Sequence, residues 1–85
     1  MTRRRTSFWI RTFGHARQSE GWVKVPRLYT RTTAAQLASD ISNAHRRDAE
    51  SRMHGVLVGE QWEAYWQPAP DGPVGDHEVW VRRVH

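Results

Sequence analysis

A chain of 85 residues with 38% hydrophobic side chains and five Trp can form one domain with a modest core, and the absence of Cys excludes disulfides and thiolate metal sites. The net charge of +4 is uneven, because residues 1–47 carry ten Lys or Arg and two acidic residues, whereas residues 48–85 carry three and seven. No apolar run approaches the ~20 residues that span a bilayer, so we expect a cytoplasmic protein that does not contact a membrane.

The basic half of the chain begins with Met-Thr-Arg-Arg-Arg-Thr, which has no apolar periodicity. We expect residues 1–6 to form a flexible basic arm and residues 7–85 to form the single domain. The arm residues Arg3, Arg4 and Arg5 are candidates for contact with the phosphates of a polyanion. A solvated tail without a partner is the alternative.

Two strands are expected next. Residues 7–13 alternate Phe8 and Ile10 with Trp9 and Arg11, which predicts a strand, and residues 14–21 contain two Gly and predict a hairpin loop. Residues 22–29 predict a second strand, which Pro26 would place at an edge of the sheet or interrupt with a bulge, because proline cannot donate to the ladder.

Residues 33–50 predict a helix. Thr33 and Gln36 have the spacing of a capping box. A narrow apolar stripe at helical spacing would pack on a sheet. Its members are Ala34, Leu37, Ala38, Ile41 and His45.

Three further strands are expected at residues 56–58, 61–67 and 78–84, with a tight turn at residues 59–60 and a Pro- and Gly-rich loop at residues 68–76. The order ββαβββ predicts an α+β domain of two layers, in which one helix covers one face of a mostly antiparallel sheet of about five strands. The basic arm with its strand–strand–helix opening over residues 1–50 resembles the arm-binding domains at the start of some phage integrases. This resemblance is one of pattern, and it assigns no residue a role.

One pattern, Trp followed by a β-branched residue and a cation, occurs three times. Because side chains alternate along a strand, each triplet would place its Trp and its cation on one face and its aliphatic residue on the other. The predicted open face therefore consists of Trp9, Arg11, Trp22, Lys24, Trp80 and Arg82. Large exposed aromatic patches usually mark a binding surface.

Three interpretations of this face remain. Its indoles could stack on unpaired bases while its cations contact phosphates, which would make the chain a small nucleic-acid-binding accessory protein of a phage, plasmid or regulatory operon, with DNA or RNA as partner. The same face could bind an acidic protein surface, as an inhibitor or adaptor does, since Trp and Arg are common hot-spot residues. It could also be structural, with Trp and Arg paired across strands. Trp62 and Trp66, near two Glu, are expected in the core or at the interface of a homodimer.

Other chemistries have weaker support. The five His lack the spacing of a metal site, so we expect no metal and no cofactor. A metal-independent ribonuclease could use His77, Glu78 and a nearby Arg as acid, base and phosphate clamp, but the chain has no phosphate loop or nucleophile motif. We therefore expect that the protein is not an enzyme and has no catalytic residues.

Overall fold

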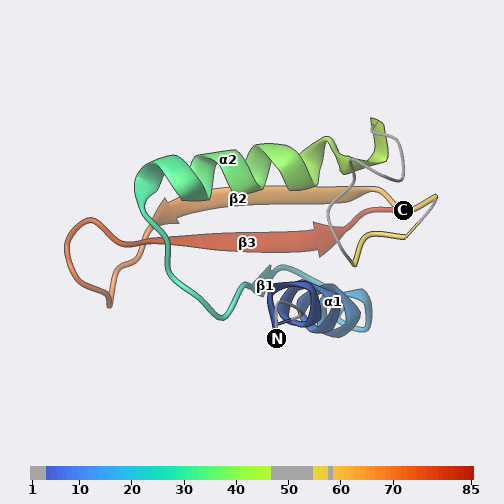
Figure 1. Cartoon of the computed structure of the whole chain (residues 1–85), viewed down its shortest axis with the longest axis horizontal. Helices are drawn as coiled ribbons and strands as arrows, with labels where there is room; N and C mark the ends of the chain where they lie inside the picture. The colour runs from blue at the N-terminus through green and yellow to red at the C-terminus, as the bar shows by residue number, and fades with distance from the viewer. Residues whose placement is uncertain (1–3, 47–54, 58) are drawn as a thin grey trace.

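The structure is a computed structural model that describes residues 4–46, 55–57 and 59–85, except for the side chains of residues 4–7. Its elements are α1 (Arg4–Arg17), β1 (Val23–Lys24), α2 (Arg31–Ser42), the short 3-10 helix η1 (Ala44–Arg46), β2 (Trp62–Pro68) and β3 (His77–Arg83) (Figure 1). The expected α+β class is confirmed, but the described residues form three strands rather than about five, with two α-helices rather than one. Neither of these helices is long and apolar enough to cross a bilayer.

The three strands form one antiparallel sheet in the order β1-β3-β2, with the last strand of the chain in the centre. Since β1 and β2 are both antiparallel to β3, they run in the same direction, and α2 forms part of the crossover between them. This is a split βαβ unit with β3 inserted between its two parallel strands. Figure 1 shows α2 lying along β2 and α1 lying beside β1.

The largest difference from the expected fold is at residues 7–13, which belong to helix α1 and not to a strand. Ile10 and Arg11, which a strand would place on opposite faces, are both exposed. The buried side chains recur at helical spacing, and they are Thr12, Phe13 and Ala16. A short apolar run is compatible with either period, and here packing of the longer stripe determines the helix.

The start of the chain differs as well. The expected arm covers residues 1–6, of which residues 1–3 lie outside the described part and residues 4–6 have a helical backbone in α1. Residues 14–17 of the expected hairpin loop also belong to α1. The described chain opens helix–strand–helix, so the strand–strand–helix pattern that resembled phage integrase domains is absent.

Helix α2 starts two residues before the expected position. Thr30 is its N-cap, and the Thr30 hydroxyl oxygen accepts a hydrogen bond from the Thr33 backbone N–H at 3.3 Å. The expected capping box at Thr33 is therefore wrong, because the N-cap lies about one turn earlier, at Thr30. Gln36, its expected partner, donates instead to Asp40 at 2.9 Å.

The apolar stripe of α2 is confirmed over most of its length, with Ala34, Ala38 and Ile41 buried. The helix ends at Ser42, and η1 then changes the direction of the chain. As a result Ala44 is buried and His45 is exposed, so the expectation that His45 continues the stripe is wrong. The Ser42 hydroxyl accepts from the backbone N–H of Ala64 at 3.3 Å and satisfies part of the free edge of β2.

The strands after α2 are the best-predicted part. Strands β2 and β3 match the expected residues 61–67 and 78–84 to within one residue, and they pair with Ala64 opposite Val81. The expected strand at residues 56–58 is not one of the strands; Val56 and Leu57 lie in irregular structure, and residue 58 is outside the described part.

Strand β1 is shorter than expected but lies at the sheet edge. Of the expected residues 22–29, only Val23–Lys24 form the strand. Beyond them the Val25 N–H donates to the Val79 carbonyl at 2.8 Å, and Tyr29 forms an isolated bridge with His77. Pro26 separates these two contacts, as its missing N–H requires.

Both helices cover the same face of the sheet. The fully buried Val79 and Val81 of β3 share a core with Ile41 of α2, Phe13 of α1 and Trp62 of β2. The Phe13 and Trp62 rings pack edge to face with their centroids 4.8 Å apart. Trp62 is therefore a core residue, as expected, and Trp66 is half-buried against the same core. Among the described elements, no helix covers the opposite face.

Candidate nucleic-acid interface

The face of the sheet opposite the helices brings together most of the predicted Trp and cation side chains. Trp80 and Arg82 alternate with the buried valines of β3, and Lys24 pairs with Trp80 across the strands. The predicted facing is thus confirmed for Trp22, Lys24, Trp80 and Arg82. We call this surface the open face, and it consists of Trp22, Lys24, Glu63, Tyr65, Gln67, Glu78, Trp80 and Arg82.

The facing predicted for Trp9 and Arg11 is wrong, because both lie on α1. Trp9 is half-buried against the core, where its ring contacts that of Phe13 at a centroid distance of 5.7 Å. Arg11 is exposed, on the other side of the helix from the core stripe. The triplet Trp9-Ile10-Arg11 has the same pattern as the other two, but it lies in a helix, so the alternation of faces along a strand does not apply to it.

The aromatic rings of the open face pack on one another. Tyr65 stacks parallel to Trp80, with a centroid distance of 6.2 Å and an interplanar angle of 6°. Trp22 meets Tyr65 edge to face at 4.8 Å. Trp22 and Tyr65 remain 37% and 38% exposed, so the cluster is half open to solvent. Tyr65, which the Trp-cation pattern did not include, is at its centre.

The charges of the open face are paired. Arg82 donates from Nε to Glu63 Oε1 at 3.1 Å, and its guanidinium lies over the Trp22 ring at 4.8 Å from the centroid. Lys24 Nζ lies 3.7 Å from Glu78 Oε2. Both cations therefore face a carboxylate, and Arg82 covers part of the ring that a base would use. This geometry matches the cross-strand cation–π arrangement more closely than a free stacking platform.

Glu78 is held as a carboxylate on this face. A hydrogen bond from the Gln67 amide is the main cause that lowers its pKa, with smaller contributions from the neighbouring Trp80 and Lys24. The Trp80 indole nitrogen is itself buried and makes no hydrogen bond of ordinary geometry among the described residues. Glu78 thus keeps its charge and opposes a phosphate at this position.

Helix α1 differs from the open face because its basic residues are not accompanied by acidic residues in the same element. Helix α1 contains four Arg and His15 but no acidic residue. Arg11 and His15 are exposed one turn apart, and the Arg27 guanidinium lies over the Phe8 ring at 4.2 Å. Among the described residues, no carboxylate forms an ion pair with Arg11 or Arg27. With Lys24 on the adjacent strand, these side chains form what we call the α1–β1 surface, which consists of Arg11, His15, Lys24 and Arg27.

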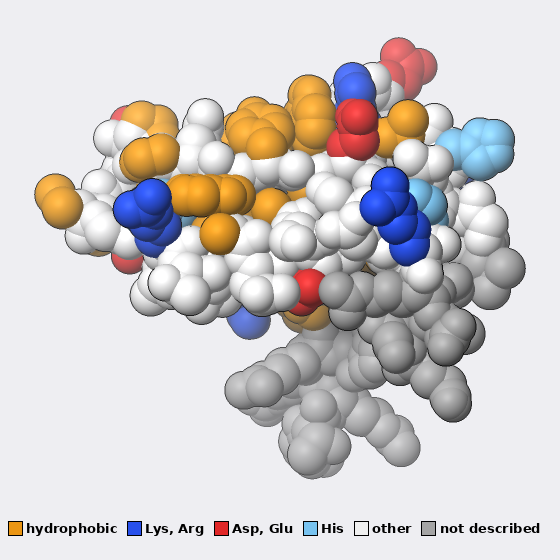
Figure 2. Space-filling view, turned by 90° about the horizontal axis from the view of Figure 1, so that it is seen from above, with side chains coloured by type: hydrophobic (Ala, Val, Ile, Leu, Met, Phe, Trp, Pro, Cys, Tyr) orange, Lys and Arg blue, Asp and Glu red, His pale blue; other side chains and the backbone are white. Residues whose placement is uncertain are grey.

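Among the described residues, the α2 side offers no comparable concentration of positive charge. Figure 2 views the molecule from this side, where Lys and Arg side chains stand apart with hydrophobic and uncharged atoms between them. One of the cations near α2, Arg31, lies over the Trp66 ring at 5.8 Å. Arg11 and Arg27, which form no ion pair with a carboxylate of the described part, both lie beside α1.

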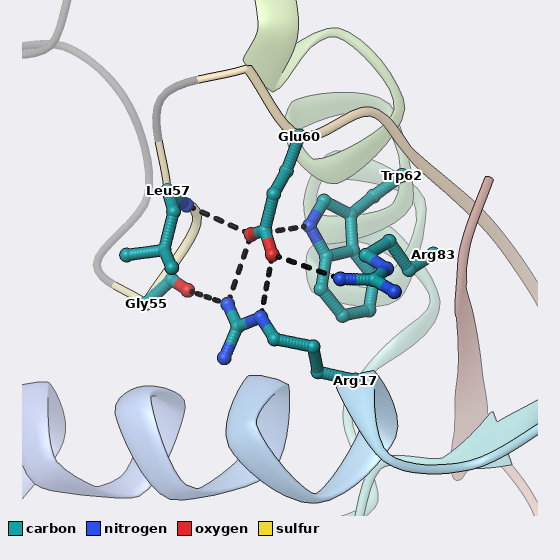
Figure 3. A network of polar contacts seen from close by, with 6 residues as sticks. All are labelled: Arg17, Gly55, Leu57, Glu60, Trp62 and Arg83. Atoms are coloured by element: carbon teal, nitrogen blue, oxygen red, sulfur yellow. Dashed lines mark hydrogen bonds and ion pairs between the residues drawn. The ribbon is translucent and has the colours of Figure 1, made fainter. Parts of the chain in front are cut away.

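A buried carboxylate holds α1 in place. Arg17 at the end of the helix donates to both oxygens of Glu60, at 2.9 Å from Nη2 to Oε1, and also to the Gly55 carbonyl at 2.8 Å (Figure 3). The Leu57 N–H and the Trp62 indole N–H donate to the same carboxylate at 2.9 and 3.2 Å.

These donors explain the ionisation of Glu60. The hydrogen bond from Arg17 is the largest cause that lowers its pKa to about 2, against the opposing effect of burial. Arg83 lies at 3.6 Å and adds a second cation. The sequence does not predict this cluster, because residues 59–60 fit a tight turn and the main partner of Glu60 is 43 residues away in the sequence.

The ribonuclease residues are not brought together. His77 packs against the Trp66 ring on the helix side of the sheet, and its Nδ1 lies 3.1 Å from the Gly75 carbonyl oxygen. Glu78 lies on the open face with Lys24 and Gln67. Neighbouring positions on a strand point to opposite faces, which separates an acid from a base at this point. Among the described residues, no group of three or more His, Asp or Glu side chains could hold a metal ion.

Comparison with protein-family models, with curated proteins and with solved structures found no match to this chain.

Proposed function

We propose that this protein binds nucleic acid through the α1–β1 surface, supported by Arg3, Arg4 and Arg5 at the start of the chain. The observation that carries this proposal is the separation of charge in the fold. Cations of the open face are paired with Glu63 and Glu78, whereas Arg11 and Arg27 have no carboxylate partner in the described residues. DNA and RNA backbones present the complementary charge.

The distribution of charge along the chain gives further support. Residues 1–31 carry eight Lys or Arg and one Glu, whereas residues 55–85 carry two Arg and five acidic residues. Arg4 and Arg5 also add two positive charges at the start of α1, whose first turn contains no acidic residue.

A salt titration tests the proposal. We expect single- or double-stranded oligonucleotides to bind at micromolar concentration or better at about 50 mM salt, with log affinity falling linearly with log salt at a slope of about −3 if three to four phosphates are contacted. Fluorescence anisotropy of a labelled oligonucleotide measures both quantities. Absence of micromolar binding to any oligonucleotide at low salt would overturn the proposal.

A protein partner on the open face is the second candidate, and one observation favours it. The half-exposed Trp22 and Tyr65 form an aromatic cluster whose neighbouring charges are already neutralised, which suits a protein surface better than a phosphate backbone. The salt titration above separates the two candidates. If nucleic acid binds at the α1–β1 surface and not at the open face, Trp22→Ala leaves oligonucleotide affinity unchanged within about twofold.

A further inference from the structure

A groove runs between α1 and β1, beside the basic side chains of the α1–β1 surface. Its volume is about 400 Å³, within the range of small-molecule sites. Both elements contribute to its walls, which consist of Phe8, Arg11, Thr12, His15, Val23, Lys24 and Pro26.

The walls of this groove combine two kinds of chemistry. Phe8, Val23 and Pro26 supply apolar surface, while Arg11, His15 and Lys24 supply basic groups, and no carboxylate of the described residues lines the groove. Thr12 adds no free donor, since its hydroxyl already donates to the Phe8 carbonyl at 2.8 Å. The occupant that this combination fits has a flat apolar part and a negative charge attached to it.

Phe8 is held in position for such a contact. Its ring packs edge to face on Trp9 at a centroid distance of 5.3 Å, and Arg27 lies over it at 4.2 Å. Arg27 covers one part of the ring, as Arg82 covers part of Trp22, so a base can contact only the part of Phe8 that lines the groove, with this cation beside it. Proteins that bind single-stranded nucleic acid commonly stack its bases on aromatic side chains and contact its phosphates with neighbouring basic groups.

A second groove nearby is less suited to a phosphate, because its lining includes acidic residues. It shares Lys24 and Pro26 but is also lined by Asp71 and Glu78, whose carboxylates would repel a phosphate. Lys24 itself lies 3.7 Å from Glu78, which is long for a hydrogen bond, and its side chain is half exposed. Because Lys24 lies on the edge strand β1 and lines both grooves, its side chain can also contact an anion in the α1–β1 groove.

We propose that the α1–β1 groove binds one unpaired nucleotide of a single strand, with the base against Phe8 and Pro26 and the phosphate between Arg11 and Lys24. This inference rests on the proposed nucleic-acid binding and adds to it a preference for single strands. Duplex DNA or RNA keeps its bases stacked and paired, so it can reach the cations but cannot insert a base into the groove.

The test uses the whole chain, a labelled single-stranded oligonucleotide of mixed sequence and its blunt duplex. We expect the single strand to bind at least about tenfold more tightly than the duplex, and Phe8→Leu to weaken single-strand binding by about five- to tenfold with little change for the duplex. Tyr65→Leu is the matched control, because it removes an aromatic ring from the open face instead, and it should change neither affinity.

Backbone amide NMR shifts supply a measurement that does not depend on a variant folding. Titration of the unsubstituted protein with the single strand should shift residues 8, 11, 23 and 24 more than residues 65 and 80. Equal affinity for the two forms, with no effect of Phe8→Leu, would overturn the groove and leave the proposed function intact. Binding to neither form would overturn both, and a larger effect of Tyr65→Leu would move the base-binding site to the open face.

Discussion

Replacing Glu60 by Gln is expected to lower the free energy of unfolding by about 2–3 kcal/mol at neutral pH. The substitution leaves Arg17 and Arg83 facing a neutral amide in a site that is only 8% exposed at Glu60. The Gln oxygen can still accept from Leu57 and Trp62, so the loss comes mainly from the ion pair. Chemical denaturation followed by tryptophan fluorescence measures the difference.

The same carboxylate makes stability depend on acid. Its pKa of about 2 in the folded protein lies below the ordinary value of 4.5, so ionised Glu60 favours the folded state above pH 4.5. That contribution, about 2–3 kcal/mol after allowing for solvent around the exposed Arg83, is lost as the pH falls from about 4.5 to about 2. In Glu60→Gln this part of the acid dependence should be missing.

Glu63→Gln is the matched control, because Glu63 also pairs with an Arg but about half of its side chain is exposed. Surface pairs of this kind contribute about 0.2–1 kcal/mol, so the variant should keep nearly the original stability and acid dependence. If the two variants were equally stable, the Glu60 cluster would have no special part in holding α1.

Gly55→Ala is expected to destabilise the fold by about 3 kcal/mol or more, with two causes. The backbone at Gly55 has φ of 98°, where residues with a side chain are strained, and an added Cβ would lie 2.8 Å from Phe13 Cδ2 and 2.9 Å from the Trp9 carbonyl oxygen. Neither neighbour can move freely, since one is a core ring and the other is helix backbone. Thermal or denaturant unfolding measures the effect.

Gly59→Ala separates these causes. Gly59 has φ of 88°, but no atom lies within 4 Å of the position of an added Cβ. Only the backbone cost of about 1 kcal/mol remains there. Equal losses in the two variants would mean that the loop does not approach α1 as closely as the structure shows.

The C-terminal half of the fold could be predicted because local pattern and tertiary packing agree there. Strand β3 alternates buried Val79 and Val81 with Trp80 and Arg82, and any sheet with one buried face gives this period. The apolar stripe of α2 was predictable for the same reason, because its buried residues recur at helical spacing. Helix α1 could not be distinguished from a strand over residues 7–13, because alternation and helical spacing both fit so short a run.

The candidate site was only partly predictable for a related reason. The face shared by Trp22, Lys24, Trp80 and Arg82 follows from strand period alone. Whether their charges are free depends on pairing across strands, and the register that places Arg82 opposite Glu63 cannot be read from either segment by itself. The basic surface beside α1 required knowing that Arg11 lies on a helix next to β1, which only the fold reveals.

The salt dependence of two matched double variants tests nucleic-acid binding through the α1–β1 surface most directly. Arg11→Gln/Arg27→Gln should weaken oligonucleotide binding and reduce the slope of log affinity against log salt by about 1.5–2, because two phosphate contacts are lost. Arg46→Gln/Arg82→Gln removes the same charge from η1 and the open face, and it should leave the slope nearly unchanged. Equal reductions in both variants, or a larger one in the second, would contradict binding at the α1–β1 surface.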